Sequence, residues 1–290
     1  MLEGLVDLHV HAGPSLMSRE LDGWEMAQEM EAAHLAAVVI KDHHIPTVTA
    51  ARIIQDHFPG LRGKVFGAIA LNNSVGGLNP KAVDVAVGFG AKVVWMPTVS
   101  SRHHIEQHSH PGVKFPAVKK RQVVPEKPIQ FLDSAGKLLP EVEQVLEVMK
   151  KYPDVILATG HGSRDEVNAI ARRAMEIGLR RVLVDHPYYM VGASLEDMKA
   201  WCDLGAFVEF TAVLSVPNSQ FYMIPAATIA DYIRKLGPDQ LVISSDYGQV
   251  GNGSPVAGMK AFIQLLRGEG IKEKDIRKMT VENPSALLGL

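Results

Sequence analysis

The residues of this chain best suited to metal chemistry are two histidines close to its start, His9 and His11. The hydrophobic residues around them alternate with polar ones, which is the period-two pattern of a β-strand. Such a strand places both imidazoles on one side, roughly 6–7 Å apart. Both can then reach one divalent ion at Zn–N distances of about 2.0–2.1 Å. The segment Ala12-Gly13-Pro14 ends the strand, so we expect the pair at its carboxyl end.

Residues of metal-ligand or acid–base type also follow four later apolar runs. They are Lys41, with His43 and His44 just beyond it, then His161, His186 and Asp246. A single histidine at a strand end is more often an ordinary loop residue, but its recurrence after separate runs favours a metal site. Nitrogen and oxygen ligands without a thiolate suit Zn²⁺, Mn²⁺ or Fe²⁺, and we expect zinc first.

The pattern of apolar and amphipathic segments predicts the scaffold that would gather these residues. Eight strands are expected at 6–11, 36–41, 64–71, 92–96, 155–160, 181–185, 207–210 and 241–245. Helical patterns lie between them, for example at 24–33, 48–57, 142–152, 166–177, 195–203, 225–236 and 256–267. Eight βα units predict an α/β protein with a (β/α)₈ TIM barrel, formed by residues 1–290 as a single domain. The carboxyl ends of its strands would meet at one mouth.

One interval between predicted strands is about twice as long as the others, because residues 98–139 form an insertion after strand four. It carries four histidines, and its end at 129–138 is typical of a hairpin with a glycine-containing turn. The insertion follows a strand's carboxyl end, so we interpret it as a lid over the mouth. The alternative is a surface loop whose histidines are only hydrated.

Composition narrows the class of protein. The 290 residues are 47% hydrophobic and 21% charged, with a net charge of −2, which is typical of a globular protein. Neither nucleic acid nor a membrane is expected as a partner. The single cysteine excludes an intrachain disulfide. The first predicted strand begins within a few residues of Met1, so we do not expect a signal peptide. We therefore expect a cytoplasmic location.

In these features the sequence resembles the amidohydrolase superfamily of metal-dependent hydrolases. The resemblance covers nearly the whole chain: the early His-x-His, the histidines of strands five and six, the aspartate of strand eight and the tail Asn283-Pro284-Ser285-Ala286-Leu287-Leu288-Gly289. It implies that His9, His11 and Asp246 bind the more buried metal. His161 and His186 would then bind a second metal, or supply one ligand and one catalytic residue.

The sequence departs from the superfamily at strand four, where binuclear members usually supply a bridging carboxylated lysine or a glutamate. Here that strand ends in Trp95-Met96-Pro97-Thr98. Two hypotheses follow. Lys41 could be carboxylated and bridge two ions, or a single ion could be held by His9, His11, His161 and Asp246, leaving His186 to handle the water.

The resulting functional hypothesis is hydrolysis of an amide, cyclic amide, lactone or ester bond of a small molecule, or a deamination. A bound divalent ion activates water, Asp246 transfers the proton, and the metal or His186 polarises the carbonyl. Three alternatives stay open: a decarboxylase of the same superfamily, a phosphoesterase of the polymerase-and-histidinol-phosphatase type, and a metal-binding barrel without catalysis. Self-association into a homo-oligomer is compatible with many outer helices.

Substrate identity does not follow from the sequence, but some contacts can be hypothesised. The insertion's basic residues favour an anionic substrate group; these are Arg102, Lys114, Lys119, Lys120 and Arg121. His43, His44, Tyr188 and Tyr247 could shape the pocket, since each follows a proposed ligand closely. The alternative for all of them is ordinary solvation or packing under loops.

Overall fold

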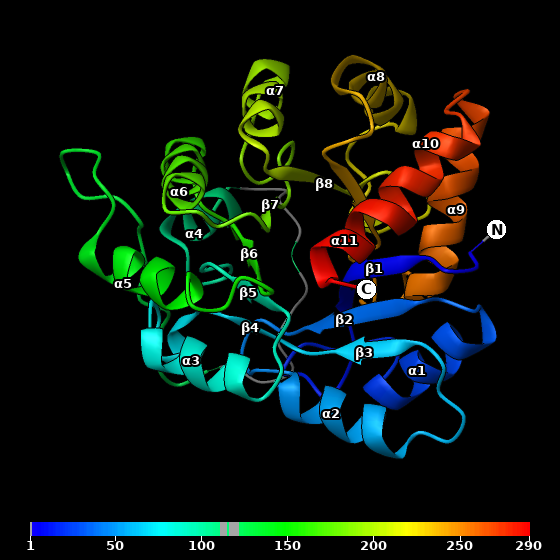
Figure 1. Cartoon of the computed structure of the whole chain (residues 1–290), viewed down its shortest axis with the longest axis horizontal. Coiled ribbons are helices and arrows are strands. Elements are labelled where there is room, and N and C mark those ends of the chain that lie inside the picture. The colour runs from blue at the N-terminus through cyan, green and yellow to red at the C-terminus, as the bar shows by residue number, and fades with distance from the viewer. Residues whose placement is uncertain (1, 111–114, 116–121) are drawn as a thin grey trace.

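A computed structural model describes residues 2–110, 115 and 122–290 and has parallel strands surrounded by helices (Figure 1). The strands are β1 (Val6–His11), β2 (Ala37–Lys41), β3 (Lys64–Phe66), β4 (Ala68–Ala70), β5 (Val93–Trp95), β6 (Ile156–Ala158), β7 (Val182–Val184), β8 (Phe207–Thr211) and β9 (Leu241–Ser244). The larger helices are α1 (Gly23–Ala32), α2 (Val48–His57), α3 (Pro80–Gly88), α4 (Arg102–His108), α5 (Pro140–Met149), α6 (Arg164–Glu176), α7 (Leu195–Leu204), α8 (Ala226–Leu236), α9 (Pro255–Gly268), α10 (Glu273–Arg277) and α11 (Asn283–Leu288).

The strands form a closed barrel. Parallel pairing runs through β1-β2-β3 and through β4-β5-β6-β7-β8-β9. The two ends join because the backbone N–H of His11 donates to the carbonyl of Tyr247 at 2.8 Å, and that of Asp246 donates to the carbonyl of His9 at 2.8 Å. Strands β3 and β4 follow one another along the chain and together occupy one position, so the predicted (β/α)₈ barrel is confirmed.

The third predicted strand is interrupted at Gly67, and the reason is the close approach of α2. A Cβ at Gly67 would lie 2.4 Å from the Cα of Val48, so only glycine fits there without a shift. The hydroxyl of Thr47, just before α2, accepts the N–H of Ala68 at 2.9 Å. That side-chain bond replaces a strand-to-strand bond at this point.

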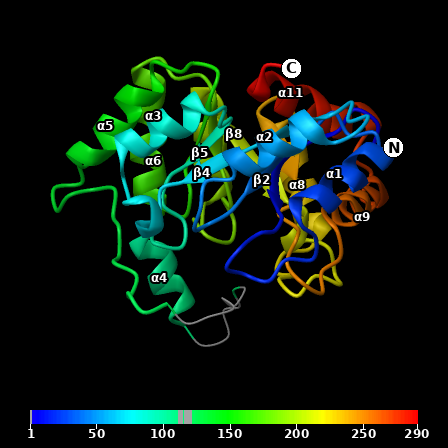
Figure 2. The same cartoon turned by 90° about the horizontal axis from the view of Figure 1, so that it is seen from below.

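A buried apolar cluster fills the barrel interior and continues into α11. Val6, Leu8, Val39 and Trp95 from the strands pack with Leu287 and Leu288 from α11. Figure 2 shows α11 on one side of the strands, with α4 and the loops after β1 and β8 on the opposite side. The carboxyl ends of the strands therefore remain open for a site, while α11 covers their amino ends.

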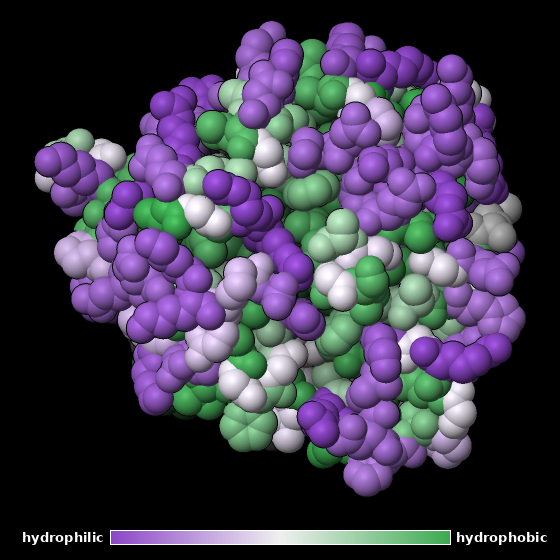
Figure 3. All heavy atoms as spheres, viewed as in Figure 1, coloured by the Kyte–Doolittle hydropathy of each residue, from purple (hydrophilic) through white to green (hydrophobic). Residues whose placement is uncertain are grey.

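Helix starts follow from local sequence. Ser163 and Glu166 form a capping box at α6, and Ser194 and Asp197 form another at α7. On the face seen in Figure 3, hydrophilic side chains dominate the periphery and hydrophobic ones gather toward the middle and lower part. In the described part of the chain, no helix has the length and apolar character needed to cross a membrane.

The insertion is only partly a loop. It contains α4, which the sequence analysis did not predict, and the predicted hairpin is reduced to a turn with one antiparallel bridge between Leu132 and Leu138. Ile129 instead pairs in parallel with Ser101. Residues 111–114 and 116–121, which include Lys114, Lys119, Lys120 and Arg121, lie outside the described residues.

Candidate metal centre

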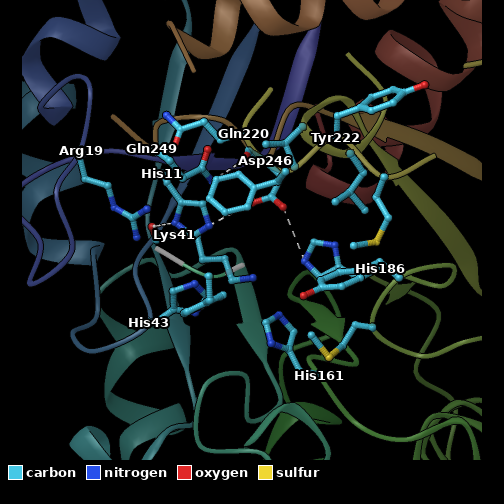
Figure 4. A pocket seen from close by; sticks show the side chains of 17 residues that line it. His11, Arg19, Lys41, His43, His161, His186, Gln220, Tyr222, Asp246 and Gln249 are labelled. Atoms are coloured by element: carbon cyan, nitrogen blue, oxygen red, sulfur yellow. Dashed lines mark hydrogen bonds and ion pairs between the residues drawn. The ribbon is translucent and has the colours of Figure 1, made fainter. Parts of the chain in front are cut away.

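The predicted strand-end residues converge at the barrel mouth, where most of them line one cavity of about 200 Å³ (Figure 4). Side chains from β1, β2 and the turns after β6, β7 and β9 face this cavity; they include His11, Lys41, His161, His186 and Asp246. His9 lies directly behind, fully buried. These residues lie on or just after five different strands, so closure of the barrel is what brings them together.

The first candidate ligand group is formed by His9, His11 and Asp246, whose ligand atoms all lie within 4.8 Å of one another. Oδ1 of Asp246 is 3.3 Å from Nε2 of His9 and 3.1 Å from Nε2 of His11. Two imidazoles and a carboxylate at these separations are a suitable donor set for Zn²⁺, Mn²⁺ or Fe²⁺.

The rings of this group are oriented by hydrogen bonds on their other nitrogens. Nδ1 of His11 is 3.0 Å from the carbonyl oxygen of Lys41, which can only accept, so Nδ1 carries the hydrogen. Nδ1 of His9 is 3.0 Å from Oε2 of Glu209 on β8. Both Nε2 atoms are therefore directed toward Asp246 with a lone pair, as metal-binding histidines require.

The second candidate group is formed by His161, Asp185 and His186, whose ligand atoms also lie within 4.8 Å of one another. Oδ1 of Asp185 accepts the N–H of Gly160 at 2.7 Å. Among the described residues, Nε2 of His161 and Oδ2 of Asp185 are buried without a hydrogen-bond partner. Buried polar atoms are rarely left unpaired, so a missing ligand is a fitting explanation.

Lys41 lies between the groups and is 1% exposed. Its Nζ is 2.9 Å from Nε2 of His9 and 4.7 Å from the centre of the Trp95 ring. Burial lowers the pKa of this ammonium group, although the carboxylates of Asp185, Asp246 and Glu209 oppose the change. An ion in the first group requires Nζ to release the lone pair of His9.

Burial shifts the protonation of the other site residues in a consistent direction. It lowers the pKa of His9 and of His186 to about 3, and that of His161 well below its usual value. It raises the pKa of Asp185 and of Glu209 to about 7. At neutral pH the histidines are therefore neutral, which is the form that binds metals.

Two of the candidate ligands have unusual backbone conformations. His186 has a φ of 50° and Asp246 a φ of 53°, in the left-handed region that non-glycine residues seldom adopt. Each is the second residue after the end of its strand. Strained residues of this kind cluster at functional sites, because surrounding structure must hold them in place.

The residues predicted to contact substrate are dispersed. His43 is buried, lines the cavity and has Nδ1 2.9 Å from Oγ1 of Thr98. His44 is buried beside Asp42, outside the cavity lining. Arg102 is exposed at the start of α4, and Tyr188 is 39% exposed. Tyr247 is buried and its ring packs closely against Gly258 of α9.

Several residues of the site were missed by the sequence analysis. Asp185 could have been found, because it directly precedes His186. Glu209 lies within an apolar strand, and His104 approaches from the insertion, with its Nδ1 2.7 Å from Nδ1 of His161. Arg19 lines the cavity from the segment between β1 and α1, and no sequence motif predicted this position.

Comparisons with known proteins agree with this geometry at the level of the fold. Residues 4–209 match a family described as a family of unknown function, DUF6282. The sequence matches no curated protein.

Among solved structures, an amidohydrolase from Pseudomonas aeruginosa is 13% identical with a TM-score of 0.64, over 99% of this chain and 95% of that one. An organophosphorus hydrolase from Deinococcus radiodurans is 14% identical with a TM-score of 0.58, over 98% and 92%. A 2,6-dihydroxybenzoate decarboxylase from Rhizobium is 14% identical with a TM-score of 0.55, over 99% of both chains. The predicted resemblance to the amidohydrolase superfamily is thus confirmed for the fold.

Proposed function

Since this chain belongs to the DUF6282 family of unknown function and has the barrel of the amidohydrolase superfamily, we propose that it is a metal-dependent hydrolase of a small molecule. The enzyme would hydrolyse an amide, cyclic amide, lactone or ester bond. Alternatively, it would remove an amino group by hydrolytic deamination. The observation that carries the proposal is the pair of β1 histidines. Their Nδ1 atoms are held by Glu209 and the Lys41 carbonyl, so both Nε2 atoms are directed at Asp246.

The donor set supports two sites, one in each group. His9, His11 and Asp246 would hold the first ion, and His161, Asp185 and His186 the second. The unpartnered Nε2 of His161 and Oδ2 of Asp185, within the described part of the chain, are what favour a second site over the single-ion alternative. A divalent ion, when bound, would supply Lewis acidity and lower the pKa of its water to about 7.

The protein's own side chains would carry out proton transfer and polarise the substrate carbonyl. Asp246 accepts the proton of the attacking water and delivers it to the leaving group. Nε2 of His186 lies 3.8 Å from Oδ2 of Asp246; in the single-ion alternative, where this histidine binds no metal, it would polarise the substrate carbonyl. His43, on the opposite part of the lining, bounds the space where substrate would lie.

The role of Lys41 in this proposal is to bridge the two groups after carboxylation. Its neutral amine would attack carbon dioxide, forming an N–C bond while Nζ loses a proton to solvent. The product would be a carbamate anion between the two ligand groups. Bicarbonate should then raise the metal content from one ion per chain toward two, and Lys41→Met should hold it at one. Equal metal content with and without bicarbonate would assign Lys41 to the hydrogen bond with His9 alone.

The central experiment compares the wild type with Asp246→Asn. Protein stripped by a chelator and reloaded with Zn²⁺, Mn²⁺ or Fe²⁺ is assayed on esters, lactones, amides and phosphomonoesters. Metal per chain is counted by mass spectrometry. We expect chelation to abolish turnover, and Asp246→Asn to keep metal while turnover falls by about 10²-fold or more. Full turnover in this variant would remove Asp246 from the mechanism, and activity on phosphomonoesters alone would favour a phosphoesterase.

Decarboxylation is the second candidate, since a solved structure of the same fold is a 2,6-dihydroxybenzoate decarboxylase. This activity needs protonation of a carbanion rather than attack by water. The same panel therefore includes hydroxybenzoates, with carbon dioxide release as the measured product.

A further inference from the structure

Arg19 is a buried cation at the edge of the candidate metal centre. It lies between β1 and α1, in a segment held to the loop after β9 by an antiparallel bridge from Arg19 to Gln249 and by the N–H of Glu20, which donates to the carbonyl of Gly248 at 2.8 Å. The side chain is only 3% exposed. Figure 4 shows its guanidinium directed toward His11 and Lys41.

Nη2 of this guanidinium donates to Sδ of Met17 at 3.7 Å, and its other donors are less well satisfied. Within residues 2–110, 115 and 122–290, Nε and Nη1 are buried and have no hydrogen-bond partner. The nearest carboxylate contact is Oδ2 of Asp42, 4.0 Å from Nη2, which is too long for a hydrogen bond. Asp42 instead uses Oδ1 to accept the N–H groups of His44 and Ile45.

The carboxylates of Asp42 and Asp246 partly balance the charge of Arg19, but burying N–H donors without hydrogen-bond partners is costly. Arginine stays protonated at any physiological pH, and its planar fork matches the two oxygens of a carboxylate or phosphonate. Arg19 lines the cavity that is also bordered by His11 and Asp246 of the first group and by His161 and His186 of the second. A ligand anion in that cavity would supply the hydrogen-bond acceptors that Nε and Nη1 lack among the described residues.

We propose that Arg19 binds an anionic oxygen group of the substrate, a carboxylate or a phosphonate-type group, and so sets the substrate class of this enzyme. The proposal rests on the proposed function, because it assumes that the reacting bond lies beside the metal groups. It differs from the anion-binding role expected for Arg102, which is exposed on α4.

The rest of the lining defines the other end of the substrate. Apolar side chains cover the wall formed by the segments after β7 and β8; they are Met190, Val213, Leu214, Phe221 and Met223. A substrate with one anionic group and an apolar or aromatic body fits both surfaces. The cavity of about 200 Å³ limits it to a small molecule.

Calorimetric binding of three probes tests this inference. Benzoate carries a planar anion, phenylphosphonate a tetrahedral one, and benzamide the same ring without charge. Each is titrated into wild type, Arg19→Met, Arg19→Lys and the exposed control Arg52→Met, in zinc-loaded and chelator-treated protein. Zinc content and melting temperature are measured for every variant, so that unfolding or metal loss is recognised.

We expect Arg19→Met to weaken binding of at least one anionic probe by about tenfold or more, since hydrogen bonds to a charged group are lost. Benzamide binding should not change, Arg19→Lys should be intermediate, and Arg52→Met should equal wild type. The preferred anion distinguishes a carboxylate from a phosphonate-type substrate group.

The inference is overturned if Arg19→Met affects all three probes equally or none of them, or if neither anion binds the wild type. If Arg19→Met and Arg19→Lys both unfold, the wild type alone tests the inference through its ratio of anion affinity to benzamide affinity. A ratio well above one supports the inference, and a ratio near one rejects it. Failure of the proposed function looks different, because the metal-reloaded wild type would then show no turnover, or would hold no metal, whatever the probes do.

Discussion

Glu209 is a buried side chain that we expect to influence the metal affinity of the candidate centre. Its Oε2 lies 3.0 Å from Nδ1 of His9, and both side chains are fully buried. Nζ of Lys41 lies 2.9 Å from Nε2 of His9, and as a cation it can only donate; the neutral ring then carries its hydrogen on Nδ1 and donates it to Glu209. The carboxylate thus fixes the ring so that Nε2 is the nitrogen available to an ion.

We expect Glu209→Ala to weaken zinc binding by about 10- to 100-fold, because the ring of His9 loses its orienting partner. Glu209→Gln keeps an acceptor oxygen and should lose less. The measurement is competition with a chromophoric chelator, with the surface variant Glu143→Gln as control. Unchanged affinity in Glu209→Ala would show that His9 is not a ligand.

Among individual site residues, the sequence predicted those at strand ends and missed those within strands, loops and the insertion. His9, His11, His161, His186 and Asp246 were predictable because a barrel directs strand ends to one mouth. Glu209 could not be predicted, because a carboxylate within an apolar strand gives no periodic signal. Arg19 and His104 reach the mouth through loop and insertion geometry, which depends on tertiary contacts.

Among the elements, the junction between α2 and the third barrel position depends on Gly67. Gly67→Ala would place Cβ 2.4 Å from the Cα of Val48, and backbone cannot yield as a side-chain tip can. We expect a loss of about 1–3 kcal/mol in the free energy of unfolding, measured in urea.

The matched control for Gly67→Ala is Gly88→Ala at the end of α3, where an added Cβ meets nothing within 4 Å. That substitution should be neutral or stabilising by about 0.4–1 kcal/mol, because it restricts the unfolded chain. Equal effects of the two changes would contradict the steric explanation of the strand break.

The strand order and most helices were predictable because apolar runs and amphipathic periods alternate regularly. The helix Pro80–Gly88 was not among the helices named, and α4 was hidden in a segment rich in histidine. The hairpin expected at 129–138 is shorter than predicted: it keeps its turn and the antiparallel bridge between Leu132 and Leu138, whereas Ile129 pairs with Ser101 across the insertion. Such pairing joins residues distant in sequence, which no local pattern encodes.

For the whole molecule, the barrel depends on α11 to close its amino-terminal end. Leu288 is 1% exposed and belongs to the interior cluster, whereas Leu290 is 54% exposed. Leu288→Ala should therefore cost about 2–5 kcal/mol of unfolding free energy. Leu290→Ala should change it little. A similar loss in both variants, measured by urea unfolding, would show that α11 contributes through its backbone alone.

The contact between His104 and His161 links distant parts of the molecule through one hydrogen atom. Burial lowers the pKa of both rings, that of His104 to about 2, so the pair shares a single hydrogen between two Nδ1 atoms 2.7 Å apart. If His161 gives its Nε2 to an ion, it must keep the hydrogen on Nδ1, and His104 must accept it. His104 then carries its own hydrogen on Nε2. Filling the metal centre therefore selects the tautomer of a residue 57 positions earlier, on a helix outside the barrel wall.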